Sequence, residues 1–156
     1  MKKKNWTRFR YMPCLPMGRD GKRVTASEEH IDLSRRAAAE GMVLLKNEGV
    51  LPLEPRRRVA VFGKGQQDYV KGGGGSGDVT TRFVVSLLDG LRQKETEGKM
   101  RLFEPASRFY SAYVARNRGD LEPGKLAEPD IPDELIKDAA KWTDTAIVVI
   151  SRYSRE

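Results

Sequence analysis

Apolar residues along the chain follow two kinds of spacing, which predict where helices and strands lie. Helical spacing links Ile31, Ala38, Met42 and Leu45. Ser27 precedes two acidic residues and is a typical helix N-cap, so we expect a helix from residue 27 to about 47. Two other segments, 58–62 and 145–150, instead predict buried strands, and the second of them is continuous and apolar.

The rest of the pattern places further helices between these strands. Those expectations are a helix at 79–92 capped by Asp78, a weak strand at 100–103, a helical stretch around 109–113, a surface excursion at 117–132 and a helix at 133–142.

Strands alternating with helices predict an α/β fold. The expected architecture is a mostly parallel sheet with helices on both faces, an α/β sandwich with flavodoxin-like layering. The run 145–150 is apolar and β-branched, as expected of a parallel strand buried on both faces. Only about three strands are found, fewer than such sheets usually have, so we expect the domain to be truncated at its C-terminal end. Ligands of such sheets bind at loops beyond the carboxyl ends of strands, here 63–78 and 151–156.

The charge of the chain is unevenly distributed. The formal net charge is +7, and residues 1–23 account for all of it, which leaves the remainder balanced. We therefore predict a basic N-terminal arm at 1–26, most simply a solvated one, and a folded domain at 27–156. Nucleic-acid binding through the folded part is not favoured, because that part carries no excess of positive charge.

Other function classes are disfavoured by what the sequence lacks. The longest apolar run, 146–150, is too short to cross a membrane. No apolar segment of a signal peptide follows the Lys-rich start, so we expect a cytoplasmic protein. Cys14 is the only cysteine, which rules out an internal disulfide, and neither a metal nor another cofactor is expected.

Two segments are candidates for chemistry. In residues 71–78 (KGGGGSGD), glycines would let the backbone approach a ligand while Ser76 presents a hydroxyl. A flexible linker is the second interpretation, and nucleotide binding is disfavoured because the glycine run does not directly follow the strand that ends at Phe62. Glu156 lies behind the second buried strand, where burial could raise its pKa to suit a general acid. Without further support, an exposed glutamate is the simpler interpretation.

Several segments together resemble one known family, the family-3 glycoside hydrolases. Residues 39–49, 51–53 and 59–63 look like the start of the second domain of these enzymes. Residues 71–78 resemble the glycine-rich loop of the β-glucosidase branch, and 146–156 resemble the strand and loop that carry the acid/base. The resemblance extends over about 27–156.

This resemblance implies a retaining hydrolysis of O-glycosidic bonds in a β-glucoside or related carbohydrate. Glu156 would be the acid/base, and Lys71, Gly75, Ser76 and Asp78 would contact the sugar. A (β/α)8-type barrel would supply the nucleophile, and some family members place that barrel after this domain, an order that we expect here. The isolated chain is expected to be inactive. The alternative is a non-catalytic sugar-binding or interaction module.

Overall fold

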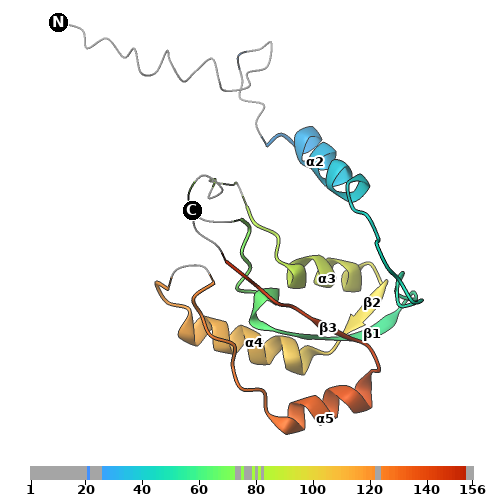
Figure 1. Cartoon of the computed structure of the whole chain (residues 1–156), viewed down its shortest axis with the longest axis vertical. Coiled ribbons are helices and arrows are strands. Elements are labelled where there is room, and N and C mark those ends of the chain that lie inside the picture. Colours follow the sequence, from blue (N-terminus) through green and yellow to red (C-terminus); the bar gives the residue numbers. More distant parts are fainter. Residues whose placement is uncertain are drawn as a thin grey trace, which may run out of the picture. The chain divides into compact units, whose positions relative to one another are not determined.

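The computed structural model describes residues 21, 26–72, 75, 79, 81, 83–121 and 124–153. The chain divides into two units, Met1–Glu48 and Gly49–Glu156. The first contains α2 (Glu28–Glu40). The second contains, in chain order, β1 (Arg57–Phe62), the 3-10 turn η2 (Lys64–Gln66), α3 (Leu87–Thr96), β2 (Met100–Leu102), α4 (Glu104–Asn117), α5 (Asp133–Trp142) and β3 (Ala146–Val148) (Figure 1).

Helix α2 begins where the sequence predicts and ends earlier. The Ser27 side chain accepts a hydrogen bond from the His30 N–H at 3.3 Å, which confirms the N-cap. The expected extension to about residue 47 is wrong, because the helix ends at Glu40 with Gly41 as its C-cap. Glycine has low helix propensity, and no residue of α2 is buried to offset the cost of extending it.

The sheet has three parallel strands in the order β2-β1-β3. Arg57 pairs with Met100 at one end of β1. Phe62 pairs with Val148 at the other end. The weak strand predicted at 100–103 is thus confirmed as β2, one residue shorter.

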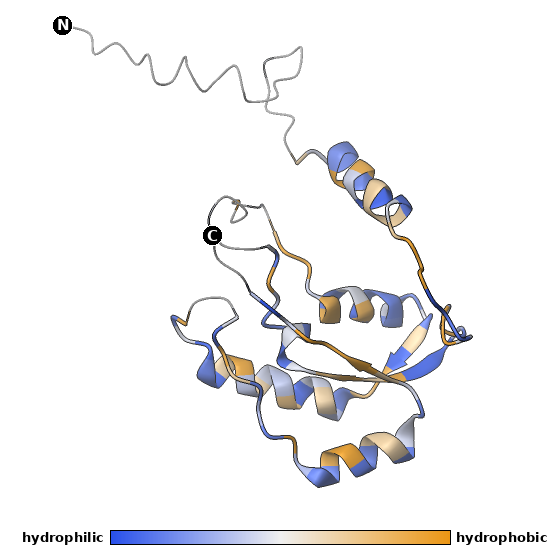
Figure 2. Ribbon diagram, viewed as in Figure 1, coloured by the Kyte–Doolittle hydropathy of each residue, from blue (hydrophilic) through white to orange (hydrophobic). Residues whose placement is uncertain are grey.

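The two faces of the sheet are covered by different helices (Figure 1). Between the sheet and α3 lie the buried residues Val59, Val61, Leu88 and Leu102. Between the sheet and α4 and α5 lie the buried residues Ala60, Phe103, Ala106 and Ala139. Successive side chains of a strand point to opposite faces, so β1 contributes to both cores. Figure 2 shows the matching bands of hydrophobic colour along β3 and on these helices. The predicted α/β sandwich is confirmed.

Helix α3 begins later than the sequence predicts. It starts at Leu87 rather than near residue 79, and its N-cap is Ser86. The Ser86 Oγ accepts from the Asp89 N–H at 3.1 Å, while the Ser86 N–H donates to the Asp89 carboxylate at 3.0 Å. The helix starts at this capping box and not earlier, because an earlier start would place the β-branched Val84 and Val85 in the helix. Asp78, the expected cap, lies outside the described residues.

Strand β3 is shorter and more exposed than expected. It spans three residues, although the Val149 N–H still donates to the Phe62 carbonyl at 2.8 Å. The expectation that this strand is buried on both faces is wrong, because Val148 is 67% exposed and Ile150 is 78% exposed. The reason is its position: β3 lies at the edge of the described sheet, and Ile147 and Val149 alone pack against the core on the α3 side.

Candidate functional site

The segments that follow β1 and β3 pack tightly against each other at the carboxyl ends of these two parallel strands. Gly63 directly follows β1, and a Cβ atom at this position would lie 2.2 Å from the Val149 carbonyl oxygen. At Gly65 a Cβ atom would lie 3.0 Å from the Cβ of Ser151. Glycine is therefore required at position 63 for the two backbones to approach this closely, whereas at position 65 a larger residue would press on the Ser151 side chain.

A third segment, 124–128, contacts the same strand end. A Cβ atom at Gly124 would lie 2.5 Å from the Cβ of Tyr153. Both carboxylate oxygens of Glu128 accept from the Lys64 N–H, at 3.0 and 3.2 Å. Residues 149–153 are thus contacted both by η2 and by this segment.

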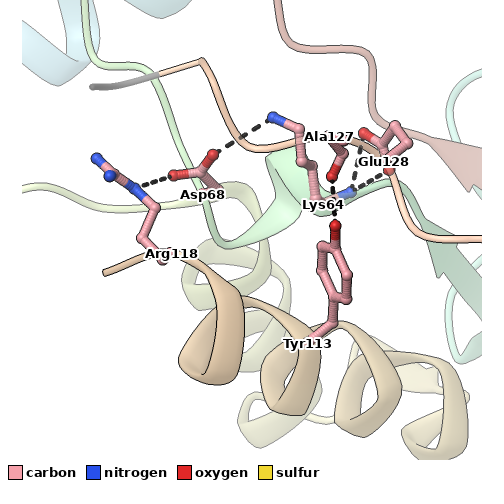
Figure 3. Close-up of polar contacts among 6 residues, drawn as sticks. All are labelled: Lys64, Asp68, Tyr113, Arg118, Ala127 and Glu128. Carbon is pink, nitrogen blue, oxygen red and sulfur yellow. Dashed lines mark hydrogen bonds and ion pairs between the residues drawn. The ribbon is translucent and has the colours of Figure 1, made fainter. Parts of the chain in front are cut away.

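A buried ion cluster, formed by Lys64, Asp68 and Arg118, lies beside these contacts (Figure 3). Lys64 Nζ lies 3.3 Å from one oxygen of Asp68, and Arg118 Nε donates to the other oxygen at 2.9 Å. The side chains of Lys64 and Asp68 are 6% and 7% exposed, and that of Arg118 is 28% exposed. Such burial is tolerated because each carboxylate oxygen of Asp68 has a cationic partner.

A cavity of about 460 Å³ is lined by residues that include Gln67 and Tyr69, the two neighbours of Asp68 in the chain. Polar and aromatic side chains among its lining residues include Gln67, Tyr69, Lys71, Ser86, Asp89 and Tyr153. Hydrogen bonds from the side chain and backbone of Ser86 lower the pKa of Asp89, so this carboxylate is ionised at neutral pH. Aromatic surface combined with a few polar groups suits a small polar ligand such as a sugar.

The candidate residues from the sequence are distributed unevenly over this site. Lys71 lines the cavity, and its ammonium group donates to the Val79 carbonyl. Gly75 has a φ of 63°, a conformation that favours glycine. Ser76, Asp78 and Glu156 lie outside the described residues.

Sequence reasoning did not identify the buried ion cluster. The only local signal was the spacing of Lys64 and Asp68, four residues apart directly after a buried strand. Nothing in the local sequence indicated that Arg118, fifty positions later, would complete the cluster. Within the described ranges, no three His, Cys, Asp or Glu side chains are grouped to hold a metal ion. In that same part of the chain, every helix is too short or too polar to cross a membrane.

Comparisons with known proteins agree on one family. The family model "Glycosyl hydrolase family 3 C-terminal domain" matches residues 42–156. The chain is 51% identical to β-glucosidase A of Butyrivibrio fibrisolvens over 153 residues, which are 97% of this chain and 18% of that protein. It is 38% identical to a β-glucosidase of Ruminococcus albus over 135 residues, 82% of this chain and 14% of that protein.

Solved structures lead to the same family. β-Glucosidase 3B from Thermotoga neapolitana, in complex with glycerol, superimposes with a TM-score of 0.72 at 36% identity, over 83% of this chain and 18% of that one. A β-glucosidase from Paenibacillus barengoltzii gives a TM-score of 0.71 at 37% identity, over 82% and 14%. The chain thus spans less than a fifth of each of these proteins. It belongs to glycosyl hydrolase family 3, and residues 42–156 match the C-terminal domain of that family.

Proposed function

We propose that this chain is the domain of a retaining β-glucosidase-type enzyme that supplies the acid/base and a sugar-contacting loop. The observation that carries the proposal is the tight packing of the segment after Gly63 against Val149. One segment leads to the glycine-rich loop with Ser76, and the other leads to Glu156, three residues beyond Tyr153. Both segments therefore leave the sheet at the carboxyl ends of its strands, where ligands of parallel sheets bind.

In the proposed reaction, Glu156 first donates a proton to the glycosidic oxygen of a β-glucoside. A carboxylate from a (β/α)8-type barrel attacks the anomeric carbon, and the bond to the leaving group breaks. Glu156 then removes a proton from the water that releases the glycosyl-enzyme. In retaining enzymes the two carboxyl groups stand about 5–5.5 Å apart. Lys71, Gly75, Ser76 and Asp78 form the loop that contacts the sugar.

The proposed partner of this domain is the barrel that carries the nucleophile. Acid/base groups contribute typically 10²–10⁴-fold to a rate and require that nucleophile to act on. We therefore expect the isolated chain to be inactive towards chromogenic β-glucosides, and measurable hydrolysis by the pure chain would contradict this part of the proposal.

A hybrid enzyme tests the catalytic role. This chain replaces the aligned 153 residues of β-glucosidase A from Butyrivibrio fibrisolvens, and hydrolysis of a chromogenic β-glucoside is measured. Glu156→Ala should reduce turnover by about 10²–10⁴-fold, and azide should restore it by replacing water in the second step. The matched control is Glu134→Gln, which changes an exposed glutamate at the start of α5 and should leave turnover unchanged.

The alternative function predicts a different result. If the hybrid is active and Glu156→Ala changes nothing, Glu156 is not the acid/base. A non-catalytic sugar-binding or interaction module would then be the better description of this domain.

A further inference from the structure

We propose that Asp68 is a positioning residue for the proposed reaction. Through Lys64 and Arg118 it holds together two segments that contact residues 149–153, the stretch that leads to Glu156. The proposal rests on the proposed function, because it concerns the placement of the acid/base. Asp68 itself acts through its neighbours and is not a catalytic residue.

Asp68 first stabilises the turn η2. Its carboxylate lies 3.3 Å from Lys64 Nζ, and its N–H donates to the Lys64 carbonyl at 2.8 Å. Asp68 therefore closes the turn from both the side chain and the backbone. Within this turn Gly65 packs against Ser151, where a Cβ atom would come within 3.0 Å. The geometry of η2 thus determines where the chain after β3 can run.

Asp68 also binds the C-terminal end of α4. Arg118 is the C-cap of that helix, and its Nε donates to Asp68 at 2.9 Å. Farther along the chain, Gly124 lies against Tyr153, and Glu128 accepts a hydrogen bond from the Lys64 N–H. Figure 3 shows the row of contacts that runs from Arg118 through Asp68 and Lys64 to Glu128.

The energetics of a buried ion cluster favour a role in geometry rather than in stability. Apolar side chains of similar volume often stabilise a buried site as well as paired charges do. Paired charges, however, require particular directions and distances, so they select one arrangement of the segments that they join. In an active site, a displacement of about 1 Å can reduce the rate by about 10²-fold.

The test measures how much the rate depends on the leaving group. An acid is needed most for a poor leaving group such as phenol and least for a good one such as dinitrophenol. In the hybrid enzyme, Asp68→Asn should lower kcat/KM for phenyl β-glucoside about tenfold more than for dinitrophenyl β-glucoside. A purely structural defect reduces the fraction of folded enzyme and lowers both values by the same factor.

Two further variants separate the possible outcomes. Asp144→Asn removes the exposed Arg57–Asp144 pair, 2.7 Å apart near the other end of β1, and should leave the ratio unchanged. Glu156→Gln should show the same dependence on the leaving group as Asp68→Asn. If Glu156→Gln shows it and Asp68→Asn does not, this inference alone is overturned. If Glu156→Gln does not show it, the proposed function fails and the inference fails with it.

Additional measurements cover the case in which Asp68→Asn does not fold or the hybrid is inactive. Arg118→Met leaves the Lys64–Asp68 pair intact and removes a less buried side chain, so it should fold and show the same selective loss. In the 156-residue chain, the amide NMR signals of Ser151 and Tyr153 should shift or broaden in Arg118→Met and not in Asp144→Asn. Unchanged signals in Arg118→Met would overturn the proposal whether or not the hybrid is active.

Discussion

The contact between Gly63 and Val149 predicts that Gly63→Ala is strongly destabilising. Gly63 has φ 99° and ψ 132°, a conformation that L residues rarely adopt. Its added Cβ would lie 2.2 Å from the Val149 oxygen and 3.0 Å from the Val149 carbonyl carbon. Val149 cannot simply withdraw, because its N–H donates to the Phe62 carbonyl at 2.8 Å and so belongs to the sheet.

The expected magnitude follows from these two effects. The backbone conformation costs about 1–3 kcal/mol for a residue other than glycine. Relief of the clash requires overpacking or loss of the Phe62–Val149 hydrogen bond, about 1–3 kcal/mol more. The free energy of unfolding should therefore fall by about 2–6 kcal/mol, a large part of the 5–15 kcal/mol that is typical of a folded domain.

Urea unfolding of the 156-residue chain, followed by circular dichroism, measures this change. Two other glycines separate the contributions. Gly98 has φ 70° and open space around its Cβ position, so Gly98→Ala should cost only about 1–2 kcal/mol. Gly90 lies within α3 with the same open space, so Gly90→Ala should stabilise by about 0.5–1 kcal/mol. If Gly63→Ala costs no more than Gly98→Ala, the reasoning about the close approach is refuted.

Four other substitutions test the packing and the titrating groups in the same assay. Leu88→Ala should cost about 2–5 kcal/mol, because Leu88 is only 1% exposed. Leu45→Ala should cost less than about 0.5 kcal/mol, because Leu45 is 92% exposed. Equal losses would contradict the assigned core. Ser86→Ala should cost about 1 kcal/mol at neutral pH, because the Ser86 side chain and N–H bond to Asp89 and lower its pKa below the ordinary 3.8. This cost should shrink as the pH falls below 3.8 and through the lower pKa of the folded state, where Asp89 becomes protonated. A cost that does not change with pH would argue against the capping box. Burial raises the pKa of Tyr110 above its ordinary value of 10.0. The stability that the protonated hydroxyl contributes should therefore be fully present below pH 10.0 and be lost as the pH rises through the folded pKa. Tyr110→Phe should abolish this loss.

Local patterns predicted the elements whose signals lie within a few neighbouring residues. The strand predicted at 58–62 became β1, and the acidic start at Asp133 became the first turn of α5. Ser27 caps α2 through its own side chain, which is a contact between residues three positions apart. Such signals depend on backbone preference and side-chain periodicity, which can be read without knowledge of distant partners.

The errors occurred where two local signals competed or where a neighbour was distant. Apolar spacing from residue 79 favoured an early start for α3, and the capping box of Ser86 with Asp89 determined the real one. The exposure of Val148 and Ile150 depends on what lies beside β3, which the run itself does not encode. For Ser76 and Glu156, which lie outside the described residues, the site roles remain proposals.

The sequence by itself determined the fold class, the family resemblance and the two segments expected to carry chemistry. Residue type, periodicity and order along the chain are sufficient for these, because they reflect local preferences and the alternation of strand and helix. Only the tertiary structure brought Gly63 against Val149 and placed Asp68 between Lys64 and Arg118. Those contacts join residues up to 86 positions apart, and their energies arise from burial and direction, which exist only after the chain has folded.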